Sequence, residues 1–229
     1  MKIQKRIQAN INLDAIAYNL ENIKKNLQKD TQIIAVLKAD GYGHGAIPLA
    51  KEIESYPYIW GIAVATVDEG MELRRAGIQK PILILGYTYE EDYDRIVQED
   101  FRPTVFKLSM AEKLSQAAKK AGKTLKIHIK IDTGMTRIGY RSPQEDIPEI
   151  VKISKLPGLE AEGIFTHFAR ADENDVSPAA RQLEKFLAFL TGLEKAGVTF
   201  PLRHCSNSAG IIRMPDANLD AVRAGVILY

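Results

Sequence analysis

The sequence has one cysteine, no long apolar run and almost no excess of one charge, and each lack excludes a class of protein. Cys205 cannot form a disulfide within the chain, as is typical of a reducing compartment. No window approaches the roughly 20 apolar residues that cross a bilayer, and the basic start MKIQKRIQANINLD lacks the apolar stretch of a signal peptide. A net charge of +2, from 31 basic and 29 acidic side chains, predicts neither nucleic acid nor a membrane as partner. We therefore expect a cytoplasmic globular protein.

Short apolar segments alternate with longer amphipathic segments along all 229 residues. The segments predicted to be strands are 33–37, 59–65, 82–86, 102–106, 124–132, 159–167, 200–205 and 220–228. The segments predicted to be helices are 14–28, 46–55, 67–76, 89–98, 109–121, 143–155, 178–196 and 207–213. This alternation indicates parallel strands joined by helical crossovers.

Capping residues mark the predicted helix ends. A hydroxyl residue with Glu three positions later forms a capping box at a helix start, and this pattern occurs at Thr66, Thr88, Ser109 and Ser142. Glycine suits the left-handed residue that follows a helix, and it stands at positions 77, 122 and 197.

The strand and helix count predicts an α/β fold, a single-domain (β/α)8 TIM barrel formed by residues 1–229. No helix follows the last strand, and we expect the helix at 14–28 to fill that position in the outer ring. The strand-like segment at 7–13 (IQANINL) has no place in such a barrel.

In this type of barrel, functional residues lie at the C-terminal ends of the strands. Lys38 directly follows the first strand, so its amine can form a Schiff base with an aldehyde at the barrel mouth. The alternative is a solvated lysine at a strand end. The segment GYGHG that follows lets the backbone approach a ligand closely, although it can equally be a simple turn.

A phosphate-binding site is predicted after the seventh and eighth strands. Ser206, Asn207 and Ser208 open a short helix there, and Gly225 offers a further backbone N–H. Capping of the helix is the alternative role of the serines and Asn207.

The fifth strand, KIHIKID, is polar on one face. Its apolar face consists of Ile127, Ile129 and Ile131, and its polar face, predicted to point into the barrel, of Lys126, His128, Lys130 and Asp132. An interior lysine such as Lys130 must be paired, neutralised or modified. It therefore belongs either to an internal ion-pair network or to a functional site with Arg137.

The four histidines show no metal-ligand spacing. His167, at the end of the sixth strand, is either a satisfied histidine in the barrel mouth or part of the site. Cys205 is expected to be a small buried hydrophobe rather than a nucleophile.

Five segments together resemble the alanine racemase family: AVLKADGYGHG, IHIKIDTGMTRIG, GIFTHFA, HCSNSAG and VRAGVILY. They follow the family's order and span nearly the whole chain. The resemblance implies a pyridoxal 5′-phosphate cofactor, held as a Schiff base on Lys38, and interconversion of L- and D-alanine to supply D-alanine for cell-wall peptidoglycan.

The resemblance also implies roles for single residues. The implied catalytic residues are Lys38, Arg137, His167 and Arg223. Lys38 would exchange the Cα proton on one face, Arg137 would lie near the cofactor's phenolic oxygen and the substrate carboxylate, and His167 would pack near the ring. Lys130 matches a lysine that is often carbamylated. The implied cofactor-binding residues are Lys38, Tyr42, Leu85, His167, Asn207, Ser208, Arg223, Gly225 and Val226.

Arg223 matches the arginine that contacts the pyridine nitrogen of the cofactor. Because arginine stays charged and can only donate, that nitrogen should remain unprotonated. The ring is then a poorer electron sink, which should limit side reactions such as transamination.

The family's second, mostly β domain is absent from this sequence. In the family it supplies a tyrosine that acts as the base on the opposite face of Cα, contributed across a homodimer. We therefore expect residues 1–229 to be the N-terminal barrel domain, weakly active or inactive alone, with segment 7–13 belonging to the absent part.

Three alternatives remain open. A non-catalytic barrel protein that manages pyridoxal phosphate supply fits the length, although KADGYGHG and DTGMTRIG resemble the racemase instead. A racemase for another small amino acid, such as serine, fits the same motifs. An unrelated barrel enzyme without this cofactor is the third.

Overall fold

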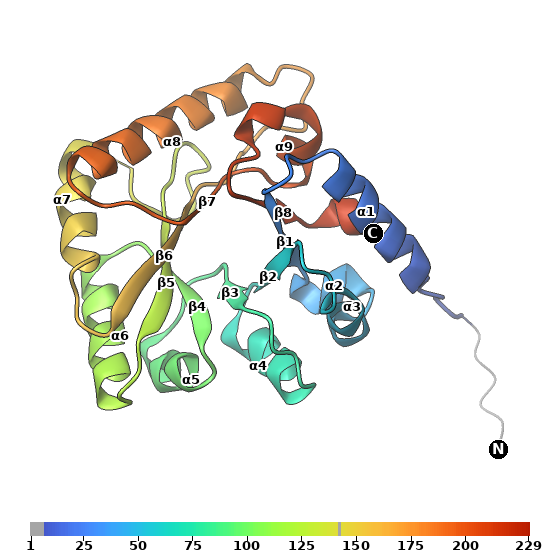
Figure 1. Cartoon of the computed structure of the whole chain (residues 1–229), viewed down its shortest axis with the longest axis horizontal. Helices are drawn as coiled ribbons and strands as arrows, with labels where there is room; N and C mark the ends of the chain where they lie inside the picture. The colour runs from blue at the N-terminus through green and yellow to red at the C-terminus, as the bar shows by residue number, and fades with distance from the viewer. Residues whose placement is uncertain (1–6, 142) are drawn as a thin grey trace.

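Eight parallel strands close into a barrel in the computed structural model, which describes residues 7–141 and 143–229 (Figure 1). The strands follow chain order around the barrel, and β1 pairs with β8 to close it. They are β1 Gln32–Val36, β2 Ile59–Val64, β3 Ile82–Ile84, β4 Phe101–Val105, β5 Leu125–Lys130, β6 Leu159–Phe165, β7 Leu202–His204 and β8 Ala221–Ala224. Each predicted strand segment overlaps one of them, and the predicted (β/α)8 TIM barrel is confirmed.

Helices surround the barrel. They are α1 Leu13–Lys25, α2 Lys38–Gly43, α3 Ala46–Ile53, α4 Val67–Arg75, α5 Tyr93–Gln98, α6 Leu108–Lys120, α7 Pro143–Ile153, α8 Ser177–Lys195 and α9 Ser208–Arg213, with 3₁₀ turns η1 Glu90–Asp92, η2 Pro215–Ala217 and η3 Val226–Leu228. None of the helices in the described residues is both long and apolar enough to cross a membrane.

The helix that precedes the first strand fills the gap after the last one, as predicted. α1 packs against α3 and η3, and Asn19 Nδ2 donates to the Leu228 carbonyl at 3.0 Å. Figure 1 shows the C-terminus lying beside α1. The outer ring therefore closes without a helix downstream of β8.

Most observed strands are shorter than the predicted segments, and two predictions depart furthest from the structure. Residues 7–12 form no strand, because Asn12 accepts from the Ala15 N–H and caps α1, which begins at Leu13. The eighth strand stops at Ala224 rather than 228, because the chain turns at Gly225 and its carbonyl accepts from Leu228 N.

One of the four predicted capping boxes is confirmed. The Thr66 hydroxyl accepts from Glu69 N, and the Glu69 carboxylate accepts from Thr66 N. The box at Thr88 is wrong, because η1 comes first and the buried Thr88 hydroxyl has no partner. The box at Ser109 is wrong because Glu149 caps Leu108 N, one residue earlier. Ser142 lies outside the described residues.

The three glycines predicted to end helices are confirmed. Gly77, Gly122 and Gly197 follow α4, α6 and α8 with φ of +92°, +66° and +80°. Left-handed backbone of this kind is open to glycine at little cost.

The barrel interior is apolar on one side and polar on the other. Its apolar part consists of Ile34, Val36, Ala63, Leu83, Leu202 and Ala221. The buried polar side chains include Arg102, His128, Lys130, Glu162, His204 and Arg223. The isoleucines of β5 pack in the outer core with the helices, so the predicted polarity of this strand's two faces is confirmed for His128 and Lys130.

Candidate active site

A cavity of about 590 Å³ opens at the C-terminal ends of the strands. Its walls contain all the implied catalytic and cofactor-binding residues together with Lys130: Lys38, Tyr42, Leu85, Lys130, Arg137, His167, Asn207, Ser208, Arg223, Gly225 and Val226. The barrel thus brings together residues spread over almost 190 positions of the chain, which supports the prediction of one common site. The prediction of Ser206 as a phosphate-site residue is wrong, because its hydroxyl is buried and donates to the Ala217 carbonyl at 2.9 Å.

Lys38 is followed by a turn of unusual backbone. Ala39 to Tyr42 all have φ between +51° and +60°, a left-handed conformation that costs roughly 1 kcal/mol or more for each residue other than glycine. At Gly41 a Cβ would lie 2.7 Å from the Cδ1 atom of Leu49, so the buried Leu49 side chain would have to move to admit one. The turn carries Lys38 and Tyr42 into the same cavity, with the Lys38 Nζ 5.7 Å from the Tyr42 ring centre.

Acidic side chains hold this strained turn from both ends. The Glu69 Oε1 atom accepts from Ala39 N at 2.7 Å, while its other oxygen accepts from Ala65 N at 2.6 Å. Asp40 accepts from Ala46 N at 2.7 Å. Charge-assisted bonds of this kind are the stronger class of hydrogen bond, so they can offset the strain that places Lys38.

A small polar recess lies where Tyr42, Ser208 and Gly225 meet. A Cβ on Gly225 would be 3.1 Å from the Tyr42 hydroxyl and 3.6 Å from the Ser208 hydroxyl. The Ser208 oxygen accepts from the N–H groups of Gly225 and Ile227, at 3.2 and 3.4 Å, so its own proton can point into the recess. The absence of a side chain on Gly225 keeps this space open for a ligand.

Asn207 has a structural role in this geometry. Its side-chain oxygen caps α9 by accepting from Gly210 N at 3.0 Å, and its Nδ2 donates to the Phe168 carbonyl at 3.1 Å. The capping alternative therefore holds for Asn207, which also lines the cavity.

Lys130 is buried in the cavity floor, and among the described residues Asp132 is the carboxylate whose charge acts on it without forming an ion pair. Its Nζ donates to the Ile131 carbonyl at 2.7 Å and lies 5.4 Å from the Phe165 ring centre. Burial, and then the positive charge of Arg223, lowers the pKa of Lys130 to about 7. The internal ion-pair network that was the alternative exists on this face of β5, but at Lys126, which binds Glu162 at 3.1 Å. Among the described residues it includes neither Lys130 nor Arg137.

Arg223 crosses the bottom of the cavity and is held firmly. Its terminal nitrogens donate to the carbonyls of Thr166, His204 and Cys205, at 2.7 to 3.1 Å, and to the His204 Nδ1 atom at 2.8 Å. Its Nε–H has no acceptor among the described residues. That donor therefore remains for a ligand.

His167 is neutral in this setting. Its Nδ1 lies 3.4 Å from an Arg223 nitrogen, which can only donate, so the Nδ1 atom accepts. Burial, and then the charges of Arg223 and Arg137, lowers the pKa of His167 to about 3. His167 therefore adds no charge to the cavity at neutral pH.

The charges around the cavity are strongly unbalanced. Four basic side chains line it, those of Lys38, Lys130, Arg137 and Arg223, against a single carboxylate, Asp172, among the described residues. Like charges this close repel one another unless an anion sits between them. The described part of the cavity wall therefore carries an excess of positive charge, which favours an anionic ligand.

Sequence reasoning missed two contributors. Phe165 stacks on His204, with ring centres 4.7 Å apart, and supports Lys130 and Arg223 from below; it shares the inward parity of His167 on the sixth strand, which could have identified it. Glu69 was read only as a capping residue, and no local pattern indicates its bond to Ala39.

The fold and the site together define a (β/α)8 barrel protein with an amine and a cation-lined anion pocket at its C-terminal mouth. The chain belongs to the alanine racemase N-terminal domain family, whose model matches residues 11–229.

Curated and solved relatives agree with this assignment. An alanine racemase of Desulforamulus reducens is 44% identical over 223 residues, which are 97% of this chain and 60% of that protein. The alanine racemase of Clostridium difficile 630, solved in complex with cycloserine, superposes with a TM-score of 0.96 at 44% identity, over 100% of this chain and 62% of that one.

A more distant solved relative carries a different name. A histidine racemase from Leuconostoc mesenteroides superposes with a TM-score of 0.86 at 26% identity, over 96% of this chain and 58% of that one. This chain thus spans about three fifths of the length of its relatives.

Proposed function

We propose that this chain binds pyridoxal 5′-phosphate and forms the half of an alanine racemase that exchanges the Cα proton of alanine on one face. The observation that carries the proposal is the placement of the Lys38 amine in one cavity with the recess at Gly225 and with Arg223. Bound there, the cofactor would supply an aldehyde for that amine and a ring that accepts electrons when a Cα proton leaves.

The recess fits the phosphate of this cofactor. The hydroxyls of Tyr42 and Ser208 and the backbone around Gly225 and Val226 supply donors, and a Cβ at Gly225 would fill part of the space. The apolar Leu85 in the wall and the buried Phe165 suit a flat aromatic ring. The cations of the cavity offset the negative charges of the phosphate and phenolate.

Arg223 would determine whether the ring nitrogen of the cofactor carries a proton. Its Nε–H is the donor left over after its other contacts are made, and it can only donate. Arg223 would therefore hold the ring nitrogen of the cofactor as an acceptor, without supplying a proton to it. A ring held in this way would be a weaker electron sink, and Arg223 would thereby limit side reactions.

Lys38 would act as the base on one face of Cα, and Arg137 would hold the substrate carboxylate. Lys130 beside them is proposed to react with carbon dioxide: the neutral amine attacks the carbon, an N–C bond forms, and a proton leaves to give a carbamate anion. That anion would pair with Arg137 and remove a cation from the crowded floor. A buried amine with a pKa of about 7 is neutral often enough to react.

The complete reaction needs a second base on the opposite face of Cα. We propose that it comes from a further region such as the relatives possess, acting in a homodimer, and that the whole enzyme works in the cytoplasm to provide D-alanine for peptidoglycan. The chain alone then exchanges the Cα proton but racemises poorly.

Exchange of the alanine Cα proton in D₂O, followed by proton NMR, tests the proposal. The 229-residue chain with pyridoxal phosphate should exchange it, the Lys38→Ala variant should not, and addition of the C-terminal region of a relative should raise racemisation. Cofactor binding without any exchange would instead favour a non-catalytic pyridoxal phosphate protein.

A different amino acid is the second candidate substrate. The histidine racemase among the structural relatives indicates that this barrel is compatible with other side chains. Exchange measured side by side with alanine, serine and histidine separates these substrates.

A further inference from the structure

A continuous line of hydrogen bonds crosses the barrel interior below the cavity. Glu162 on β6 faces His128 Nε2 at 3.3 Å, and His128 Nδ1 faces His204 Nε2 at 3.0 Å. The His204 Nδ1 atom then faces a terminal nitrogen of Arg223 at 2.8 Å. Both imidazoles are fully buried, so their hydrogen bonds to each other and to Arg223 are shielded from bulk water.

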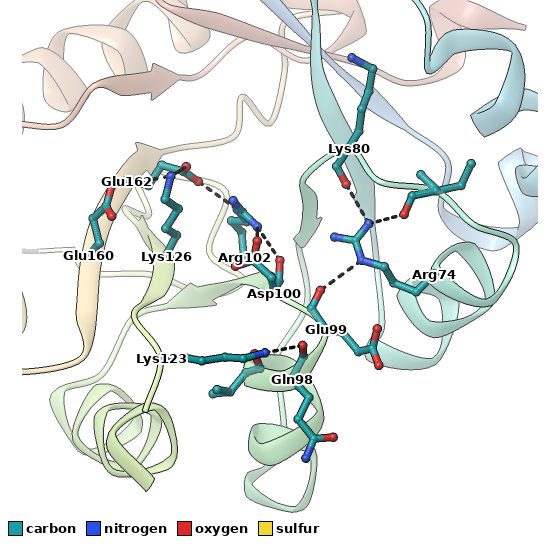
Figure 2. A network of polar contacts seen from close by, with 12 residues as sticks. Arg74, Lys80, Gln98, Glu99, Asp100, Arg102, Lys123, Lys126, Glu160 and Glu162 are labelled. Atoms are coloured by element: carbon teal, nitrogen blue, oxygen red, sulfur yellow. Dashed lines mark hydrogen bonds and ion pairs between the residues drawn. The ribbon is translucent and has the colours of Figure 1, made fainter. Parts of the chain in front are cut away.

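The far end of the line is an ionised carboxylate. Figure 2 shows Lys126 and Arg102 directed at Glu162, at 3.1 and 3.3 Å, with Arg102 in turn bound to Asp100. Hydrogen bonding from His128 and the charge of Arg102 outweigh burial and lower the pKa of Glu162 to about 2. At neutral pH Glu162 can therefore only accept.

The two ends set the direction of every bond between them. Because Glu162 accepts, His128 carries its proton on Nε2 and leaves Nδ1 as an acceptor. His204 must then donate from Nε2, which leaves its Nδ1 to accept from Arg223. The other tautomer of His128 would set two N–H groups against each other in the buried core, where an unsatisfied donor costs about 1–3 kcal/mol.

The backbone is shaped to admit this arrangement. The pairing of β5 with β6 shifts register between Ile127 and His128, so that Glu162 is the extra residue. A Cβ at Gly163 would come within 2.5 Å of the His128 ring. The position of His128 thus depends on a glycine and a bulge as well as on its polar partners.

We propose that Glu162 and His128 are positioning residues for Arg223, which act by fixing the tautomer of His204 and so the direction in which the Arg223 Nε–H points. The described residues contain no carboxylate in contact with Arg223, and the line of imidazoles connects it to the charge of Glu162 instead. The inference rests on the proposed function in one respect: the Nε–H of Arg223 is taken as the donor to the ring nitrogen of the cofactor.

Imidazole and guanidinium ¹⁵N NMR of the cofactor-free 229-residue chain tests the line directly. His128 and His204 should both be protonated on Nε2 alone. A proton on Nδ1 of either ring would overturn the proposal, and this measurement needs no variant.

Three variants test the positioning role. Glu162→Met removes the acceptor and Gly163→Ala displaces the His128 ring, and each should shift the Arg223 Nε–H signal and weaken pyridoxal phosphate binding by about tenfold, as loss of one buried hydrogen bond predicts. Glu162→Gln keeps an acceptor oxygen and should stay within about threefold of the parent.

The outcomes separate the two proposals. An unchanged Arg223 signal in folded Glu162→Met and Gly163→Ala variants would reject the positioning role even if the cofactor binds. Absence of cofactor binding in the parent chain would reject the proposed function, while the tautomers and the Arg223 signal still decide the positioning role.

Discussion

Glu69 and Ala39 are joined by a 2.7 Å hydrogen bond that ties the left-handed turn after β1 to the start of α4. Glu69→Gln keeps one acceptor oxygen of the two, so either Ala39 or Ala65 loses its partner. We expect a stability loss of about 1–2 kcal/mol and a several-fold slower reaction of Lys38 with pyridoxal phosphate. Urea unfolding and stopped-flow absorbance measure the two effects.

Glu72→Gln is the matched control for this change. Glu72 lies on the same helix with an exposed side chain, and its replacement should change stability by less than about 0.5 kcal/mol. Equal effects of the two substitutions would reject the role of Glu69 in placing Lys38.

Gly225 should tolerate no side chain in the holo form. In Gly225→Ala the new Cβ crowds the Tyr42 hydroxyl and the phosphate recess, and overpacking of this kind costs about 1–3 kcal/mol. Pyridoxal phosphate should bind at least about tenfold more weakly in a fluorescence titration. An unchanged affinity in a normally folded variant would place the phosphate elsewhere.

In buffer free of carbon dioxide, where Lys130 remains an amine, it should make the cofactor-free protein more stable at alkaline than at neutral pH. Its pKa is about 7 when folded, against 10.5 ordinarily, so the unfolded chain binds more protons between these values and stability rises with pH across that window. Lys130→Met should remove this slope and stabilise the protein at pH 7 by about 2–4 kcal/mol.

Lys155→Met, at an exposed position, serves as the control and should retain the rise of stability with pH.

The carbamate has its own test: ¹³C-labelled bicarbonate should give a carbamate carbon signal in the parent chain that disappears in Lys130→Met. A signal that persists in the variant would assign the modification to another amine.

Buried histidines should make the fold sensitive to mild acid. Burial comes first among the causes that lower the pKa of His128, His167 and His204 below 6.5. The unfolded chain then binds more protons as pH falls below about 6.5, and stability is lost by up to about 1.4 kcal/mol per pH unit for each histidine.

Urea unfolding at pH values from 7.5 to 5 measures this loss, above the range in which most carboxylates titrate. In the His167→Asn variant, the free energy of unfolding should fall less steeply with decreasing pH, by the contribution of one histidine. A free energy of unfolding that stays constant over this range would show that the folded protein protonates these imidazoles as readily as the unfolded chain does.

Much of the fold could be predicted from the sequence because periodicity and helix ends are local signals. The strand segments, the inward face of the fifth strand and the role of the 14–28 helix follow from such patterns. The errors occur where distant contacts decide the structure: Glu149 caps Leu108 from another helix, and the turn at Gly225 depends on its carbonyl and on Ser208.

The candidate site likewise contains residues that the sequence could predict and residues that it could not. Residues directly after strands, such as Lys38 and Ser208, were predictable because the barrel gathers strand ends at one mouth. Glu162 and Arg102 were not, because their partnership with His128 depends on the stagger of strands around the barrel and on the bulge in β6.

Reduction with borohydride and peptide mapping tests the central claim most directly. The 229-residue chain, incubated with pyridoxal phosphate and reduced, should carry a pyridoxyl group on the peptide that contains Lys38, and Lys38→Ala should carry none there. A pyridoxyl group on another lysine of the parent chain, or on no residue at all, would contradict the account.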